Sequence, residues 1–440
     1  MAVTTAGAHA GELPLRSLSM AGSSFGLIAG KFAAMALGFL FWLVAARHFD
    51  AASVGLAAAA VSAMMLCVQF AHLGAGSAFV SEFPTHRARP ARLLDTTFSL
   101  GAAAAIAAAG IFLAVAATSL ADLGPVLATP AFATLFVAVT VLGTLGVLLD
   151  QVSMALRRGD HVAVRNTLGG TATLVSLVVL VLVADDAGPL ALFALWLAGT
   201  GVIVVAGMSQ VRRSARPYRY RLRLHRPSAD RLVGIGLPNY ALTLSDRAPG
   251  LVLPLVVTEL LSAGANAYWY TAWMMAWAAY VVPVSVGTAL FAEVCQARHD
   301  LAAATRRALR SSLRLGIAAA VILGLGAEVV LAPLGPDYAA AGAGPLRLLL
   351  LAIVPLAFVQ TWFAVCRACH RLGEAVGTAM LGGTVVVAAT AVAGAGGGLE
   401  AMAATWSATQ LLLGLWCWAR LRRTIRDGAG PVPAPVWAGR

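Results

Sequence analysis

Charged residues are scarce in this chain, and that scarcity excludes an ordinary soluble protein. Only 11% of its 440 residues are charged and 60% are hydrophobic, whereas about a quarter of the residues of a soluble domain are charged. Lysine is almost absent: Lys31 is the only one among 31 cationic residues. The length therefore does not indicate two or three soluble domains.

Long apolar runs take the place of the missing charges. Twelve runs of about 20 residues can be drawn, the length that a helix needs to cross a hydrocarbon core of roughly 30 Å. The sequence therefore predicts an all-α, polytopic membrane protein with twelve transmembrane helices. The runs are 20–46, 53–80, 95–119, 131–156, 165–184, 187–211, 232–259, 267–292, 312–332, 344–366, 375–395 and 400–419.

The positions of the cations predict how the chain lies in the membrane. All but four of the 31 fall at the termini or in the even-numbered gaps between runs, and the exceptions are Lys31, Arg47, Arg247 and Arg347. Short loops rich in Lys and Arg mark the cytoplasmic side, so both termini are predicted to be cytoplasmic. This bias also explains the net charge of +12. Nucleic-acid binding is not predicted, because it needs basic residues gathered on one exposed surface.

The longest polar stretch divides the runs into two sets of six. We predict an N-terminal six-helix bundle over residues 1–211 and a basic cytoplasmic linker over 212–231. Residues 232–440 then form a C-terminal six-helix bundle with a basic cytoplasmic tail.

Short landmarks recur between the two halves at an offset of about 212 residues. Leu123-Gly124-Pro125 returns as Leu334-Gly335-Pro336, and Arg158-Gly159-Asp160 returns approximately as Leu372-Gly373-Glu374. Gly55 corresponds in the same way to Ala267. These matches predict a duplicated six-helix unit whose two copies share one orientation, as in transporters built from parallel repeats.

Ionisable residues inside apolar runs are the first candidates for a site, because each costs about 2.5–3.5 kcal/mol at mid-bilayer on insertion scales and usually faces a cavity. Lys31 lies in the first run, and Asp246 and Arg247 lie in the seventh. Asn239 and Thr243 extend the seventh run's polar residues along one helix face. We hypothesise that Lys31 and Arg247 contact an anionic substrate while Asp246 holds one of them. The alternative is that these charges only neutralise partners on neighbouring helices.

Aromatic residues gather at the start of the eighth run. Trp269, Trp273 and Trp277 share one helix face at four-residue spacing, which suits stacking against sugar rings. The alternative is an aromatic belt at the membrane interface, which Trp and Tyr favour for purely physical reasons.

No cofactor or metal is predicted. Cys366-Arg367-Ala368-Cys369-His370 spells the pattern of haem attachment, but it falls on the predicted cytoplasmic side, where such attachment does not occur. The other cysteines are scattered, so no disulfide framework is predicted. The predicted extracytoplasmic loops are too short to carry catalytic groups, and an enzyme is not predicted.

Several segments together resemble the polysaccharide flippases of the multidrug/oligosaccharidyl-lipid/polysaccharide exporter superfamily. The resemblance is loose and covers nearly the whole chain. The segments are Ser24 to Arg47, His48-Phe49-Asp50, Val54-Gly55-Leu56-Ala57, Gly236-Leu237-Pro238, Asp246-Arg247, Ala267 to Tyr270 and Leu334-Gly335-Pro336-Asp337-Tyr338-Ala339.

The resemblance implies two bundles in a V that alternate access across a bacterial plasma membrane. The substrate would be a polyprenyl-pyrophosphate-linked oligosaccharide moved to the outer leaflet for cell-surface polysaccharide synthesis. Membrane lipids and a polysaccharide polymerase or glycosyltransferases would be partners. A cationic cavity suits a diphosphate, since paired cations lower the free energy of removing it from water.

Two related transporter classes remain as alternatives. A cation-coupled multidrug exporter of the same superfamily would be expected to carry an acid in its first helix, where this chain has only Lys31. A peptidoglycan-precursor flippase is closer in substrate chemistry, but that family usually has fourteen helices.

Overall fold

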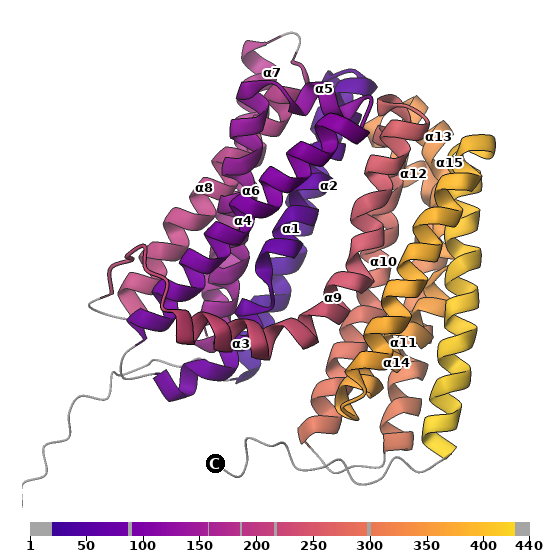
Figure 1. The fold of residues 1–440 in the computed structure, drawn as a ribbon. Coiled ribbons are helices and arrows are strands. Elements are labelled where there is room, and N and C mark those ends of the chain that lie inside the picture. The colour runs from indigo at the N-terminus through magenta and orange to yellow at the C-terminus, as the bar shows by residue number, and fades with distance from the viewer. Residues whose placement is uncertain are drawn as a thin grey trace, which may run out of the picture.

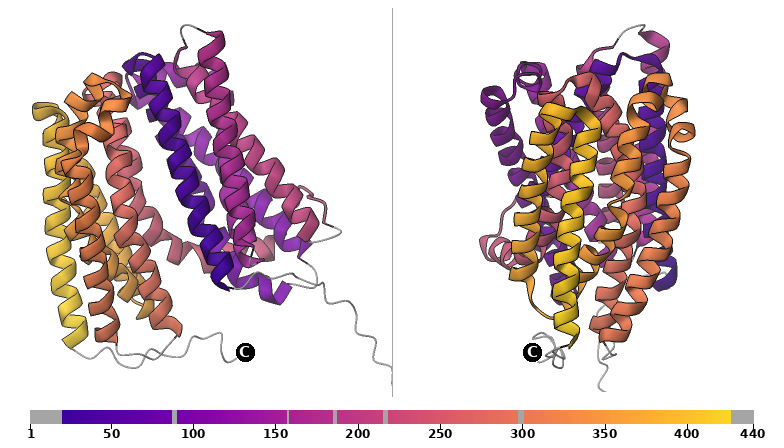
Figure 2. Two further views of the ribbon diagram at one scale, coloured as in Figure 1. Left: turned by 180° about the vertical axis from the view of Figure 1, so that it is seen from behind. Right: turned by 90° about the vertical axis from the view of Figure 1, so that its right-hand side faces the viewer.

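The computed structural model describes residues 20–86, 90–156, 158–184, 187–214, 218–296 and 301–426, and within these ranges the chain is helical with no strand. The predicted all-α class is confirmed. Two groups of helices lie side by side and separate toward one end, as the arms of a V do (Figure 1). The same separation is visible from behind in the left panel of Figure 2.

The first group begins at residue 20. Its elements are α1 (Met20–His48), α2 (Ala51–His72), α3 (Ala75–Glu82), η1 (Phe83–His86), α4 (Ala91–Ser119), α5 (Leu123–Leu127), α6 (Pro130–Ala155), α7 (Gly159–Val183) and α8 (Pro189–Ser214).

The second group follows α8 after a short segment without helix. Its elements are α9 (Arg226–Leu260), α10 (Ala263–Gln296), α11 (Leu301–Leu325), α12 (Ala327–Leu331), η2 (Ala332–Leu334), α13 (Pro336–Leu350), α14 (Ile353–Ala368) and α15 (Leu372–Arg426).

Many of these helices are long enough to span a membrane. Among the described residues, eight helices are long and apolar enough to cross a membrane, or nine if the bent pair α13–α14 counts as one span. α15 contains two of the predicted runs, 375–395 and 400–419, separated at Gly398, where φ is 64° and the helix breaks. The predicted count of twelve stays a prediction.

Two predicted runs are broken in ways that hydrophobicity did not indicate. Within the run 53–80, α2 ends at His72 and α3 begins at Ala75, because Leu73 and Gly74 adopt φ values of 46° and 72°. Gly74 is needed there for a second reason: a Cβ would lie 2.3 Å from the backbone of Gly236 on α9. The run 344–366 is bent by 46° between α13 and α14.

The predicted linker is shorter in the structure than 212–231, because α8 continues to Ser214 and α9 already begins at Arg226. α9 then passes between the two groups of helices. It packs on α2, α3 and α4 of the first group and on α10 and α15 of the second. Figure 1 shows this helix crossing from one group to the other near its label.

The packing of the first group is repeated in the second. α1 packs on α7 as α9 packs on α15, and α2 packs on α4 as α10 packs on α11. The pairs α4–α6 and α11–α14 also correspond. This pattern supports the predicted duplication.

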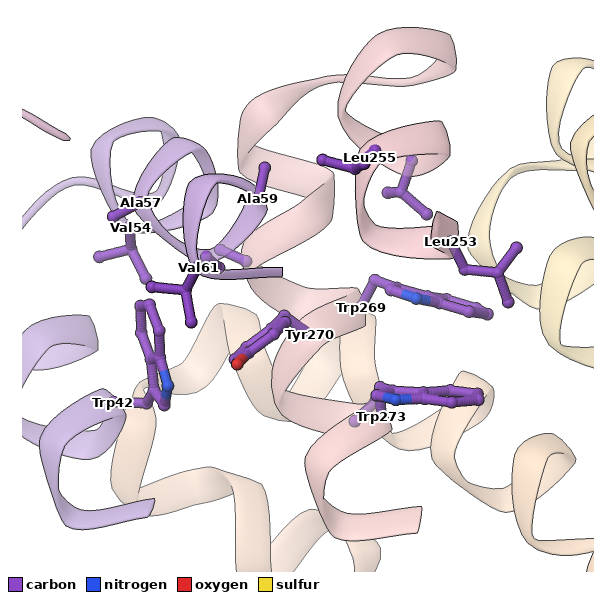
Figure 3. Close-up of a cluster of buried hydrophobic side chains, with 14 of the residues drawn as sticks. Trp42, Val54, Ala57, Ala59, Val61, Leu253, Leu255, Trp269, Tyr270 and Trp273 are labelled. Carbon is purple, nitrogen blue, oxygen red and sulfur yellow. The ribbon is translucent and has the colours of Figure 1, made fainter. Parts of the chain in front are cut away.

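The groups meet at the predicted outer end, where α2 crosses α10. A Cβ on Gly55 would lie 1.7 Å from the carbonyl oxygen of Ala263, and the Asn266 side-chain amide donates to the Gly55 carbonyl over 2.8 Å. Apolar side chains of α1, α2, α9 and α10 fill the space beside this crossing, with Trp42 and Tyr270 in edge contact at 5.0 Å (Figure 3). The closely packed end therefore holds the two groups together.

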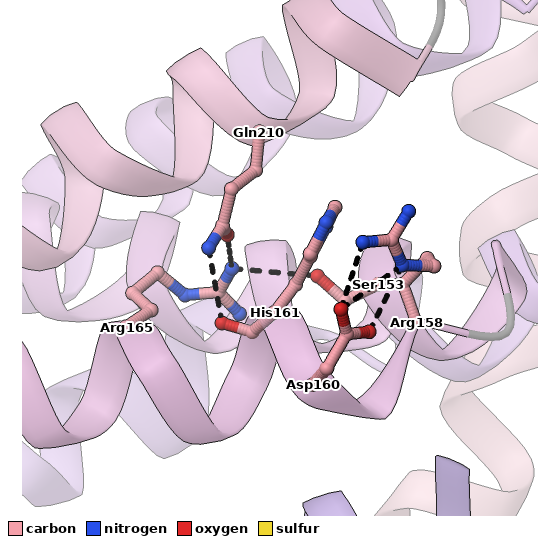
Figure 4. Close-up of polar contacts among 6 residues, drawn as sticks. All are labelled: Ser153, Arg158, Asp160, His161, Arg165 and Gln210. Carbon is pink, nitrogen blue, oxygen red and sulfur yellow. Dashed lines mark hydrogen bonds and ion pairs between the residues drawn. The ribbon is translucent and has the colours of Figure 1, made fainter. Parts of the chain in front are cut away.

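Arg165 differs from its predicted place in a cytoplasmic gap, because α7 begins at Gly159 and carries it inward. Its side chain is fully buried and forms an ion pair with Asp150. It also donates to Gln210 over 2.7 Å and to Ser153 over 3.3 Å. Figure 4 shows the last two contacts, which join α6, α7 and α8.

Candidate functional site: a cavity between the bundles

A cavity of about 660 Å³ lies between the two groups of helices. Most of its wall is apolar, with methionines and aromatic rings from both groups. Arg247 is the only charged residue among the described residues that line it, and Gln69 and Ser62 are polar. The aromatic and methionine residues are Met35, Phe39, Trp42, Met65, Trp196, Tyr270, Trp273, Met274, Met275 and Trp277.

Arg247 reaches the cavity from α9. Its side chain is exposed and forms no hydrogen bond or ion pair with any other described residue. The ring of Trp273 lies against the same helix at Gly250, where a Cβ would come within 2.5 Å of the indole. Gly250 therefore allows an aromatic wall to lie one turn from the cation.

Asp246 faces the interior of the second bundle. It lines a small adjoining cavity of about 40 Å³ together with Gln360 and Gln410, and Arg247 and Trp273 line both this cavity and the larger one. The Gln360 side-chain amide donates to both carboxylate oxygens of Asp246, over 3.0 and 3.1 Å. No ion pair joins Asp246 to Arg247 among the described contacts, although the two are adjacent in sequence. Asp246 is therefore held by an amide of α14, and Arg247 lines both the small cavity and the larger one between the bundles.

A second cation lies close behind this pair. Arg367, half-buried on α14, donates to the Thr243 hydroxyl over 3.0 Å. Sequence reasoning placed Arg367 in a cytoplasmic gap, because the predicted run ended at 366 while α14 continues to Ala368. One indication of this is present in the sequence: the first residues of the C-x-x-C-H segment continue the helix beyond the apolar run, and Arg367 is among them.

The three tryptophans do not share one environment. Trp273 and Trp277 line the cavity. Trp269 is fully buried and stacks on Trp273, with ring centroids 6.2 Å apart (Figure 3). The four-residue spacing places all three on one face of α10. Along that face, Trp273 and Trp277 lie at the cavity, whereas Trp269 lies in the packed outer end.

Of the other predicted site residues, one lies away from this geometry and one has its side chain outside the described part of the chain. The side chain of Lys31 falls outside the part of the chain that the structure describes. Asn239 is exposed on α9 and is not among the residues that line either cavity. Beside it, Tyr240 donates to Gln69 of α2 over 2.5 Å and stacks on His72 at 4.8 Å.

The outer end carries polar contacts between the bundles that the sequence did not reveal. The Glu259 carboxylate, on α9, accepts backbone hydrogen bonds from Ala121, Asp122 and Leu123 at the start of α5, over 2.6, 3.1 and 2.9 Å. Arg47 of α1 donates to the carbonyls of Ala332 and Pro333 in η2. Glu259 ends a predicted run and Arg47 lies in a short predicted loop, and at such positions a charge indicates only hydration.

Two helical bundles around a shared central cavity, packed together at one end, define a transporter fold. The described residues contain no group of three His, Cys, Asp or Glu side chains that could hold a metal ion.

Comparison with solved structures assigns the fold more closely. The chain is similar to the lipid II flippase MurJ in an inward closed conformation, with a TM-score of 0.71 and 12% identity over 90% of this chain and 87% of that one. It is also similar to an inward-facing multidrug resistance transporter of the MATE family of the MOP superfamily, with a TM-score of 0.65 and 14% identity over 91% and 99%.

A MOP-superfamily transporter from Pyrococcus furiosus, described as having a binding pocket of reversed polarity, gives a TM-score of 0.60 and 12% identity over 92% and 96%. The fold is therefore that of the MATE and MurJ transporters. No protein-family profile matches the chain, and no curated protein sequence is significantly similar.

Proposed function

We propose that this protein is a flippase that moves a polyprenyl-pyrophosphate-linked oligosaccharide from the inner to the outer leaflet of a bacterial plasma membrane. The observation that carries the proposal is Arg247, which pairs with no other described residue and is the only charged residue among the described residues that line the cavity. A guanidinium in such a site binds phosphate oxygens by paired, charge-assisted hydrogen bonds.

The rest of the cavity suits the other parts of such a substrate. Methionine side chains adapt to irregular apolar ligands, so Met65, Met274 and Met275 would contact the first isoprenyl units. Trp273 and Trp277 present rings that can stack on sugars. A cavity with one cation and an aromatic, methionine-rich wall therefore matches an amphiphile whose charge is a diphosphate.

Asp246 and Arg367 would act behind this contact. Asp246 is held by Gln360 and forms no ion pair with Arg247 among the described contacts, while Arg367 adds a second positive charge from α14. If Lys31 faces the same cavity from α1, each bundle contributes one cation. The outer-end contacts of Glu259 and Arg47 would close the cavity to the outside, so this conformation loads substrate from the cytoplasmic side.

The proposal predicts a loss of transport in Arg247→Gln. A hydrogen bond to a charged group contributes about 1.5–3 kcal/mol, so we expect the flipping rate at limiting substrate to fall about tenfold or more. Arg247→Lys should retain part of the rate because the charge remains. The measurement is flipping of a fluorescent polyprenyl-diphosphate oligosaccharide in proteoliposomes.

Arg347→Gln is the matched control, since Arg347 is paired with Glu328 over 2.8 Å inside the second bundle. Its rate should stay within about twofold of the original. Equal rates for Arg247→Gln and the unsubstituted protein, at equal amounts in the membrane, would remove Arg247 from the transport path.

Drug export is the second candidate, and the aromatic and methionine wall favours it because such surfaces also bind apolar drugs. Efflux of ethidium from the same proteoliposomes separates the two functions. A lipid-linked disaccharide-peptide offered beside the oligosaccharide separates a peptidoglycan-precursor flippase from a polysaccharide flippase. Ethidium efflux without any flipping of the diphosphate lipid would favour the exporter.

A further inference from the structure

The segment Tyr218–His225, here called the strap, joins α8 to α9 and has an alternating sequence. Its even positions are aromatic or aliphatic and its odd positions are cationic or histidine. In an extended chain, alternate residues lie on opposite sides. The even residues are Tyr218, Tyr220, Leu222 and Leu224, and the odd residues are Arg219, Arg221, Arg223 and His225.

Side chains of α4 hold the strap in place through its backbone. The buried carboxylate of Asp95 accepts from the Tyr218 hydroxyl over 2.9 Å and from the Arg221 amide over 3.1 Å. The Ser99 hydroxyl accepts from the Arg223 amide over 3.2 Å, and the Thr96 hydroxyl accepts from the His225 amide over 3.3 Å. Amides at every second residue face one helix, as an extended chain requires.

The two tyrosines anchor the strap to the first bundle. Tyr218 is buried, and Tyr220 makes an edge contact with Phe98 at 6.2 Å. Burial, together with the hydrogen bond to Asp95, raises the pKa of Tyr218. The phenol therefore stays a neutral hydrogen-bond donor throughout the physiological range.

The fixed strap and the first turns of α4 enclose a cavity of about 650 Å³. Arg92, Arg219, Arg221, Arg223 and His225 line it. Asp95 is the only acidic residue among the described lining residues, and its oxygen is already used by the strap. The cavity is therefore strongly positive and is separate from the one between the bundles.

The strap packs on the start of a helix that is long and apolar enough to span a membrane. α4 is one of the candidate membrane spans and begins at Ala91, and the strap packs on its first turns. Leu222 and Leu224 are 79% and 55% exposed. Exposed leucines beside arginines at the end of a span suit the boundary between acyl chains and headgroups.

We propose that this cavity binds the phosphate group of an anionic phospholipid of the cytoplasmic leaflet, with Leu222 and Leu224 against its acyl chains. The excess of positive charge on the cytoplasmic side of membrane proteins requires cationic side chains there, but it does not require that they be held in fixed positions. Here the backbone amides of Arg221, Arg223 and His225 are held at alternate positions by hydrogen bonds to one helix. A free phosphate would use the arginines but would leave the leucines uncovered, so the lipid is the better match.

The test measures binding of dioleoylphosphatidylglycerol to the purified full-length protein by native mass spectrometry. Removing three cations from one phosphate site should weaken binding about tenfold or more. We expect this for the triple variant Arg219→Gln/Arg221→Gln/Arg223→Gln. The matched control, Arg306→Gln/Arg310→Gln/Arg314→Gln, removes the same charge from exposed positions of α11 and should change affinity less than twofold.

A further variant separates fixed geometry from charge. Asp95→Leu makes the protein more positive and yet removes the acceptor that holds Tyr218 and Arg221, so we expect weaker binding. Melting curves confirm that each variant is folded, and the two triple variants decide the question if Asp95→Leu is not.

Three results would overturn the proposal. Equal loss of affinity in both triple variants would mean general attraction between charges, and no loss in either would exclude the site. Displacement of the lipid by inorganic phosphate below millimolar concentration would make a free anion the ligand. Equal binding of uncharged dioleoylglycerol would exclude a role for the phosphate.

Discussion

Arg165 is a fully buried cation, and its contacts account for how the first bundle stays together at the predicted cytoplasmic end. Removing a guanidinium from water is unfavourable unless its donors are satisfied. Asp150 and Ser153 of α6 and Gln210 of α8 accept from it, and the Gln210 amide in turn donates to the His161 carbonyl over 3.2 Å. Three helices are therefore joined through one side chain.

We expect Arg165→Met to destabilise the protein. Breaking a buried ion pair costs about 3–5 kcal/mol, and the lower end applies because the Asp150 side chain is 30% exposed. The melting temperature in detergent should fall by several degrees, and adding Asp150→Leu should restore part of the loss. A melting temperature equal to that of the unsubstituted protein would show that the network contributes nothing to stability.

Single residues of the candidate site were predicted where polarity stands out against an apolar run. Arg247 and Asp246 were found in this way. Arg367 was missed because it follows the run by one residue, and Trp269 was included because a four-residue spacing does not tell which side of a helix face is packed. Partners such as Gln360 come from another helix, and no local pattern indicates them.

Among the elements, α5 shows how the outer end is closed. This short helix of the first bundle presents its first backbone amides to a carboxylate of the second, since Glu259 accepts from Ala121, Asp122 and Leu123. Negative charge at a helix N-terminus is favourable. The contact therefore stabilises the conformation in which the bundles meet at this end.

We expect Glu259→Gln to shift the molecule toward a conformation open at the outer end. An amide keeps one acceptor but loses the charge, and a change of about 1.4 kcal/mol alters an equilibrium tenfold. Distances between spin labels at Ala128→Cys and Ala340→Cys, in a protein without its native cysteines, report the separation of the bundles. The long-distance population should rise.

Glu328→Gln is the control for this measurement, because Glu328 pairs with Arg347 within the second bundle and its loss should leave the distances unchanged. Identical distance distributions for Glu259→Gln and the unsubstituted protein would mean that the outer end is held by apolar packing alone.

The existence of the helices was predicted well because each apolar run is long and uninterrupted. Their breaks were predicted less well. Leu73 and Gly74 sit in an apolar stretch that hydrophobicity alone extends to residue 80, and the break depends on the approach of Gly236 from α9. A contact between segments 162 residues apart leaves no trace in the local sequence.

At the scale of the whole molecule, the cation of the cavity, Arg247, predicts a response to voltage. An inside-negative potential contributes about 2.3 kcal/mol per charge per 100 mV. It favours outward movement of a diphosphate and inward return of an empty, cationic cavity. Under the proposed function, collapsing a potassium diffusion potential across proteoliposomes should slow flipping severalfold. An unchanged flipping rate would mean that the membrane potential does not drive turnover.

The arrangement into two bundles was predictable from the recurring landmarks and the long basic stretch. Gly55 and Ala267, predicted to be equivalent positions of the two halves, lie next to each other in the structure. A Cβ on Gly55 would lie 3.1 Å from the amide nitrogen of Ala267. Equivalent residues that touch lie beside the axis relating two halves. The position of α9 was not predictable, because its sequence shows only that it is a helix.

α9 belongs to both arms of the V. Gly236 and Tyr240 fasten its beginning to the first arm, while Thr243 and Asp246 are fastened to α14 in the second. If the arms tilt against each other, this single rod must flex within about one turn, between Tyr240 and Thr243. Pro238 leaves the Gly234 carbonyl without its helical donor, which weakens the helix just before that turn. Any such bend and the side chain of Arg247 would then lie on one continuous helix.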